Sequence, residues 1–90
     1  MGRVLILTLA LLCAGCSKPA VDAFYYPDRN DLTKVVVIPN VGSVEKCREV
    51  IRQKAVEYGD AGLNHGDYEC AIGPTGKFVG TAQVYKRTVQ

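Results

Sequence analysis

The stretch Cys47–Cys70, CREVIRQKAVEYGDAGLNHGDYEC, joins a helical pattern to a strand pattern through a glycine-rich connection. Apolar residues recur every three or four positions, as on one face of a helix, at Val44, Cys47, Ile51, Ala55 and Tyr58. From Asp67 to Ile72 apolar and polar side chains alternate, which is typical of a half-buried strand. The stretch therefore predicts a helix followed by a strand, with one cysteine on the buried face of each.

The ends of the predicted helix carry recognisable signals. Ser43 is a favourable N-cap residue, and Glu45 places a negative charge in the first turn, where the helix dipole favours it. Gly59 follows the last residue of the apolar face and suits a C-terminal stop. We therefore expect the helix to run between Ser43 and Gly59.

Cys47 and Cys70 have several interpretations. In an exported protein of this size we favour a disulfide, which would close a loop of 24 residues and stabilise the fold by about 3.4 kcal/mol in the loop-entropy model. A metal pair, a redox pair and two unpaired thiols remain alternatives. The short spacings typical of zinc sites and of redox motifs are absent.

The first 15 residues have the features of a secretory signal. Arg3 supplies the positive charge, Val4 to Leu12 form an apolar run, and small residues follow. A run of this length is too short to span a bilayer, which needs about 20 residues. The leader therefore predicts export rather than a membrane-spanning helix.

The sequence Leu12-Cys13-Ala14-Gly15-Cys16 resembles the lipobox of bacterial lipoproteins, from which it departs at Cys13. The resemblance implies cleavage after Gly15 and lipidation of Cys16, which becomes the N-terminus of a protein anchored in the membrane through acyl chains. The serine after Cys16 implies the outer membrane, facing the periplasm, in a Gram-negative host. We interpret residues 16–31 as a tether and residues 32–90 as the domain.

The domain is predicted to be a small α+β fold with the order β-α-β-β, one helix lying on a three-stranded sheet. Thr33 to Ile38 is a β-branched run and predicts a strand that is central in the sheet or covered on both faces. Gly73-Pro74-Thr75-Gly76 has the composition of a type I turn, so we expect the returning strand over residues 77–86. The connection from residue 38 to residue 67 is long enough for a helical crossover.

One face of such a sheet would lack a covering helix. The aromatic and apolar residues available to it form the predicted contact surface: Phe24, Tyr25, Tyr26, Val79 and Tyr85. These side chains either cover the open face or contact the lipid interface or an envelope protein partner.

The residues offer no catalytic constellation, so we predict neither an enzyme nor a cofactor. His65 is the only histidine, and a loop histidine beside glycine is most simply a surface residue. Ser43 is better explained as a helix cap than as a nucleophile. Asp67 and Glu69 are interpreted as an exposed acidic edge rather than a catalytic pair.

Net charge and composition narrow the classes of partner that we expect. Without the leader the net charge is about +1, with ten Lys or Arg against nine Asp or Glu, and no basic cluster predicts nucleic-acid binding. No metal-ligand motif is present. Gly66 to Gly73, with the helical cysteine upstream, faintly resembles small uncharacterised secreted bacterial proteins, which implies a disulfide-linked α+β domain and no activity. We expect an anchored binding or structural module, or alternatively an inhibitor or immunity-type lipoprotein that blocks a hydrolase or toxin through the loop Asp60–Gly66.

Overall fold

The computed structural model describes residues 19–90. The predicted leader and Cys16, the predicted lipidation residue, lie outside this part of the chain. The described elements, in chain order, are β2 (Val21–Tyr26), β3 (Val36–Ile38), α1 (Val44–Glu57), β4 (Asp67–Val79) and β5 (Ala82–Val89).

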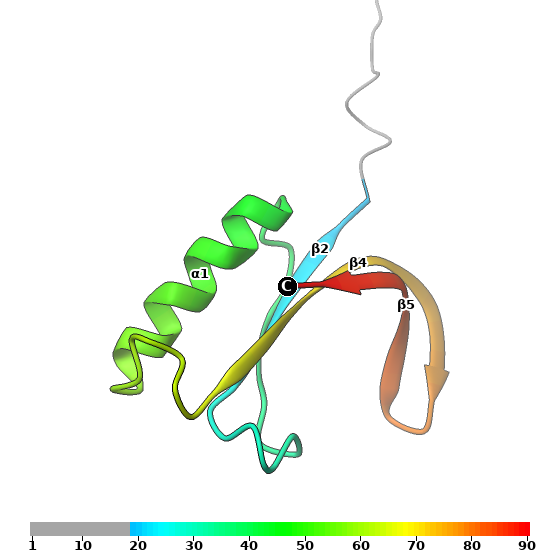
Figure 1. Ribbon diagram of the computed structural model, residues 1–90. Helices are drawn as coiled ribbons and strands as arrows, with labels where there is room; N and C mark the ends of the chain where they lie inside the picture. Colours follow the sequence, from blue (N-terminus) through cyan, green and yellow to red (C-terminus); the bar gives the residue numbers. More distant parts are fainter. Residues whose placement is uncertain (1–18) are drawn as a thin grey trace, which may run out of the picture.

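The strands form one antiparallel sheet in the order β3-β2-β4-β5, and α1 covers one of its faces (Figure 1). The predicted α+β class is confirmed, but the sheet has four strands rather than three. Strands β3 and β4 both run antiparallel to β2, which lies between them. They therefore run in the same direction, and the chain passes from one to the other through α1.

Strand β2 corrects the predicted tether, because Val21–Tyr26 is a central strand of the sheet. Its odd-numbered residues Val21, Ala23 and Tyr25 are buried, whereas the residues between them are half-buried. This alternation is that of a strand with one covered face. The aromatic residues at the end of the segment are thus part of the fold, and the domain begins at Val21 rather than at residue 32.

Strand β3 is shorter and more exposed than the sequence predicts. It has three residues and lies at the edge of the sheet, paired only with β2. Val36 and Ile38 pack against the core, while Val37 on the other face is 47% exposed. The prediction of a central or doubly covered strand was wrong, because β3 lies at an edge and the only helix of the described chain covers one face of the sheet.

Helix α1 begins and ends where the sequence predicts. The Ser43 side chain accepts a hydrogen bond from the Lys46 N–H at 3.1 Å, which satisfies one free donor of the first turn. At the other end Gly59 has φ of +74°. The N–H groups of Gly59 and Asp60 donate to the carbonyls of Val56 and Ala55, as in a Schellman motif.

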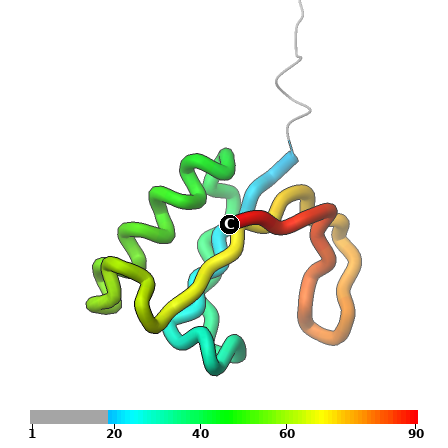
Figure 2. Tube along the Cα trace, viewed as in Figure 1, coloured from blue at the N-terminus to red at the C-terminus, as the bar shows by residue number. Residues whose placement is uncertain are grey.

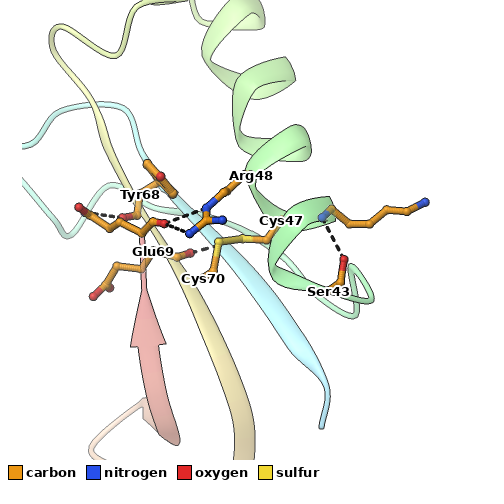
Figure 3. The surroundings of a disulfide bond; sticks show 8 residues. Ser43, Cys47, Arg48, Tyr68, Glu69 and Cys70 are labelled. Atoms are coloured by element: carbon orange, nitrogen blue, oxygen red, sulfur yellow. Dashed lines mark hydrogen bonds between the residues drawn. A yellow bond between two sulfur atoms is a disulfide. The ribbon is translucent and has the colours of Figure 1, made fainter. Parts of the chain in front are cut away.

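A disulfide between Cys47 of α1 and Cys70 of β4 links the helix to the sheet (Figure 3). The two Cα atoms lie 6.0 Å apart, a separation that suits a disulfide. Both cysteines are fully buried, among core residues from β2, α1 and β4: Val21, Ala23, Tyr25, Ile51, Ala55 and Ile72. The disulfide interpretation is confirmed.

The C-terminal hairpin turns later than predicted. Residues 73–76 do not reverse the chain but lie within β4, where the pairing with β5 becomes irregular between Pro74 and Phe78. Proline cannot donate a ladder hydrogen bond, so it occurs in sheets at bulges and edges. The chain reverses instead at Gly80 and Thr81, where Gly80 has φ of +63°, a conformation that two-residue hairpin turns require.

The irregularity also bends the hairpin. Its outer half curves away from the rest of the sheet on the side opposite α1, while the C-terminus returns beside the centre of the sheet (Figures 1 and 2). We call this outer half, residues 74–85, the arm. It gives the uncovered face of the sheet a concave shape.

Candidate functional site

The uncovered face contains an open hollow of about 930 Å³. Its floor includes Phe24 and Tyr26 of β2 and Ala71 of β4. On one side lie residues of the arm, among them Phe78, and on the other lie residues of β3 and the segment before it: Leu32, Val35 and Val37. The hollow is therefore bounded by three parts of the chain that are distant in sequence.

Four apolar side chains of this hollow are widely exposed to solvent: Leu32 (57%), Val35 (41%), Val37 (47%) and Phe78 (61%). Single exposed apolar residues are common on proteins, but several around one concavity are typical of an interaction site. A sheet face whose apolar residues are accessible can bind another apolar surface while the domain stays fully folded.

Two side-chain hydrogen bonds fix the orientation of the tyrosine rings in the hollow. The Tyr26 hydroxyl donates to Glu69 Oε1 at 2.7 Å, and the Tyr85 hydroxyl donates to Asp22 Oδ2 at 2.7 Å. The Phe24 and Tyr85 rings meet edge to face, with centroids 5.7 Å apart, a favoured arrangement for aromatic pairs. The hollow is thus lined by rings held in fixed orientations.

The same contacts raise the pKa of both tyrosine hydroxyls. Burial raises the pKa of Tyr26, and its hydrogen bond to Glu69 and the nearby carboxylates of Glu69 and Asp67 raise it further. Burial, together with the hydrogen bond to Asp22 and the charge of that residue, raises the pKa of Tyr85 to about 12. Both phenols therefore stay protonated, and keep donating their hydrogen bonds, to a higher pH than an exposed tyrosine would.

The predicted contact surface divides into three groups. Phe24, Tyr26 and Tyr85 line the hollow. Tyr25 does not, because it is fully buried on the opposite face, where its ring packs against Tyr58 at 5.4 Å. Val79 is 74% exposed but is not part of the lining. The inclusion of Tyr25 was an error, since neighbouring residues of a strand point to opposite faces.

Sequence reasoning missed Leu32, Val35, Val37 and Phe78. Val35 and Val37 belong to a continuous apolar run, which hides the alternation between faces. Phe78 was placed on a strand after the wrong turn, so its position across from Leu32 and Val35 was not foreseen. Only the three-dimensional bend of the arm brings these side chains around one hollow.

The loop between α1 and β4 is a second ordered feature. Asp60 is buried, and its carboxylate accepts hydrogen bonds from the backbone N–H groups of Asn64, His65 and Gly66 at 2.8–2.9 Å. Burial disfavours the charged carboxylate, but the hydrogen bonds from His65, Gly66 and Asn64 outweigh it and lower the pKa of Asp60. A single side chain thus fixes the path of the loop.

Arg29, from the segment after β2, holds the same loop from its other side. Its guanidinium Nη2 donates to the carbonyls of Leu63 and Gly66, each at 2.7 Å, and its backbone N–H donates to the His65 carbonyl. Gly66 is packed so closely that a Cβ there would lie 2.7 Å from the Tyr26 carbonyl oxygen. The loop is therefore rigid, with the side chains of Asn64 and His65 exposed at its surface.

The other candidate polar residues have local roles. Ser43 caps α1, and Glu69 accepts the hydrogen bond of Tyr26. Asp67 accepts from its neighbour Tyr68 and from the Gln90 side chain. Within residues 19–90 no three His, Cys, Asp or Glu side chains are grouped as metal ligands would be. The one helix in this range is too short and too polar to cross a membrane.

Comparison with known proteins adds no relative: no family model, no curated protein and no solved structure matches this chain.

Proposed function

We propose that this protein is a small lipoprotein of the cell envelope, anchored through an acylated Cys16, whose concave sheet face binds an apolar segment of another envelope protein. The anchor rests on the leader, with its positive start, its short apolar run and its lipobox-like end at Cys16. The observation that carries the binding role is the hollow, in which four accessible apolar side chains surround fixed aromatic rings.

The chemistry of the hollow favours a protein partner over a small polar ligand. Thr, Gln and Arg side chains also line it, but the one carboxylate of its lining, that of Glu69, is already bound to Tyr26. Burial of apolar area contributes about 25 cal/mol per Å², and interfaces gain most from central aromatic residues. The exposed residues Val37 and Phe78 on opposite sides of the hollow would then enclose the partner segment.

The anchor is tested by intact-mass analysis of the protein purified from membranes. We expect a chain that begins at Cys16 and carries the added mass of acyl groups, and a Cys16→Ser variant that loses both the acyl mass and membrane retention. A full-length or unacylated chain would contradict the anchor.

The binding role is tested with a Val37→Ser/Phe78→Ser double variant. Both side chains are largely exposed, so the fold should persist, while the apolar walls of the hollow are removed. Val56→Ser is the matched control, because Val56 is 64% exposed but lies on α1, outside the hollow. Quantitative crosslinking in intact cells should recover the partner with the wild-type protein and with the control, but not with the double variant. Equal crosslinking by all three proteins would contradict the proposal.

A second candidate function is inhibition of a hydrolase or toxin through the loop from Asp60 to Gly66. The rigidity of this loop favours it, since a segment that is already ordered loses less entropy on binding. An Asn64→Ala/His65→Ala variant separates the two candidates. If it abolishes partner binding while the Val37→Ser/Phe78→Ser variant binds normally, the loop rather than the hollow is the contact.

A further inference from the structure

The position of β2 leaves a very short connection to the proposed anchor. Cys16 and Val21 are five residues apart, so the extended chain between them reaches at most roughly 17 Å. The headgroup layer of a bilayer takes up about 6 Å of that length. The first residue of β2 would therefore lie within about one Debye length of the membrane surface, where charges interact with charged lipids.

The topology identifies the end of the domain that lies there. The Val21 carbonyl accepts a hydrogen bond from Val41 N–H, just before α1, and Val21 pairs with Ile72 of β4, which pairs with Arg87 of β5. The start of β2 and the start of α1 lie at the same end of the molecule (Figure 1). We call this end of the domain the proximal end.

Among residues 19–90 three exposed cations occur at the proximal end: Lys46 in the first turn of α1, and Lys86 and Arg87 of β5, of which Arg87 also lines the hollow. Within residues 19–90 none of them forms an ion pair. The aliphatic part of Lys86 lies over Gly73, where an added Cβ would come within 2.9 Å of its side chain. Two carboxylates share this end: Glu45, beside Lys46, and Asp22, which accepts hydrogen bonds from Asn40 N–H and from Tyr85.

At the opposite end of the domain acidic side chains outnumber basic ones. It includes the segments that follow β2 and α1, with the acidic residues Asp28, Asp31, Glu57, Asp60 and Asp67. Its lysines Lys34 and Lys54 lie 4.0 Å and 3.0 Å from the carboxylates of Asp31 and Glu57. Arg29 also lies at this opposite end, where its guanidinium donates to the carbonyls of Leu63 and Gly66. Among the cations of the two ends, those with neither an ion pair nor a side-chain hydrogen bond within residues 19–90 are thus the ones at the end that the short connection holds near the membrane.

From these observations we infer that Lys46, Lys86 and Arg87 form a contact with the headgroups of lipids that carry a net negative charge. The contact fixes the domain with its proximal end on the membrane, and it rests on the proposed acylation of Cys16. Acyl chains combined with a basic patch give a more stable attachment than either alone. In this orientation the loop from Asp60 to Gly66 points away from the lipid.

Chemical labelling of the acylated protein tests the contact. The protein is reconstituted into vesicles of phosphatidylcholine alone or of phosphatidylcholine with phosphatidylglycerol. Accessible lysine amines are then modified with an amine-reactive reagent, and the extent of modification at each lysine is measured by peptide mass spectrometry. We expect several-fold protection of Lys46 and Lys86 only in the anionic vesicles, with loss of protection at high salt. Lys34 and Lys77, both exposed, serve as internal controls that should label equally in both.

A second measurement uses Lys46→Gln/Lys86→Gln/Arg87→Gln with Lys34→Gln/Arg52→Gln/Lys77→Gln as the charge-matched control. Both proteins are reconstituted into a mixture of neutral and anionic vesicles that can be separated by density. In the first variant the ratio of protein on anionic to protein on neutral vesicles should fall by roughly fivefold for each charge removed. The control should keep its preference.

The outcomes separate this inference from the proposed function. Absence of acyl mass on the purified protein would overturn the anchor and the oriented contact with it. Acylated protein in which all lysines label alike, or in which Lys34 is the protected one, would overturn the contact alone.

Discussion

The Tyr85 hydroxyl reaches across strand β4 to Asp22, and their oxygens lie 2.7 Å apart. Tyr85 belongs to β5 and Asp22 to β2, two strands that are not neighbours in the sheet. A backbone ladder cannot join such strands, so this side-chain bond is a direct link between the base of the arm and the centre of the sheet. It helps to set the curvature that creates the hollow.

Tyr85→Phe should therefore lower the free energy of unfolding by about 1 kcal/mol. Because the pKa of Tyr85 in the folded protein is raised from 10.0 to about 12, its contribution is complete below pH 10.0 and is lost as the pH rises through about 12. Spectrophotometric titration of the phenols should show the loss of one high-pKa tyrosine. Tyr58→Phe, at an exposed ring, is the control and should change stability little.

Reduction of the Cys47–Cys70 disulfide should destabilise the fold by about 3 kcal/mol, because the reduced unfolded chain regains the entropy of an open loop. Domains of this size have a total stability of roughly 5 kcal/mol, so the effect is large. Urea unfolding with and without reductant measures it. A Cys47→Ala/Cys70→Ala variant should show no dependence on reductant, and an unchanged wild-type midpoint would contradict the prediction.

Asp60→Asn should loosen the loop before β4 and lower Tm by several degrees at neutral pH, because the amide offers one acceptor oxygen where the carboxylate offers two. The pKa of Asp60 is lowered in the folded state, so its contribution is present above the ordinary carboxyl pKa and is lost as the pH falls through the lowered value. The difference in Tm between the two proteins should shrink in acid. A constant difference at every pH would contradict this role.

Gly66→Ala should cost about 2 kcal/mol, because its Cβ would meet the backbone oxygen of Tyr26, which has little freedom to move. Gly62→Ala in the same loop is the matched control. There the new Cβ would meet only the flexible Asn64 side chain, at 3.3 Å, and the cost should stay within about 0.5 kcal/mol. Thermal unfolding of both variants gives the comparison.

Tyr25→Phe and Tyr26→Phe should differ in their effect on stability although the residues are adjacent. The buried hydroxyl of Tyr25 has no hydrogen-bond partner in residues 19–90, so its removal should leave stability unchanged or raise it by about 1 kcal/mol. Tyr26→Phe loses the bond to Glu69 and should destabilise by a similar amount. Equal losses for both variants would show that Tyr25 makes a hydrogen bond in solution.

The sequence was informative where one physical signal dominates. The spacing of Val44, Cys47, Ile51 and Ala55 predicted the helix and its buried face, and Ser43 and Gly59 marked its ends, because caps and periodicity act within a few residues. The alternation around Cys70 predicted the inner half of β4. The disulfide was favoured over a metal pair, a redox pair and free thiols because the leader predicts export and the short spacings of metal and redox sites are absent.

The sequence was misleading where the answer depends on long-range pairing. Val21 to Tyr26 follows the predicted leader and precedes a turn, so it was interpreted as part of a tether. Asp22 is its only charged residue, and the period-two pattern appears in its burial rather than in its sequence. Gly73-Pro74-Thr75-Gly76 and Gly80-Thr81 both contain turn residues, and local chemistry did not decide which would reverse the chain. The hollow depends on both features, and therefore only part of its lining was predicted.

The placement of β2 has a mechanical consequence for a tethered protein. Any pull on the proposed anchor enters the domain along Val21–Tyr26, which is hydrogen-bonded to a neighbour on each side. The strand would have to slide past both neighbours at once instead of peeling from an edge, and many bonds would share the load. A domain built in this way would resist extraction by a force applied through the proposed anchor.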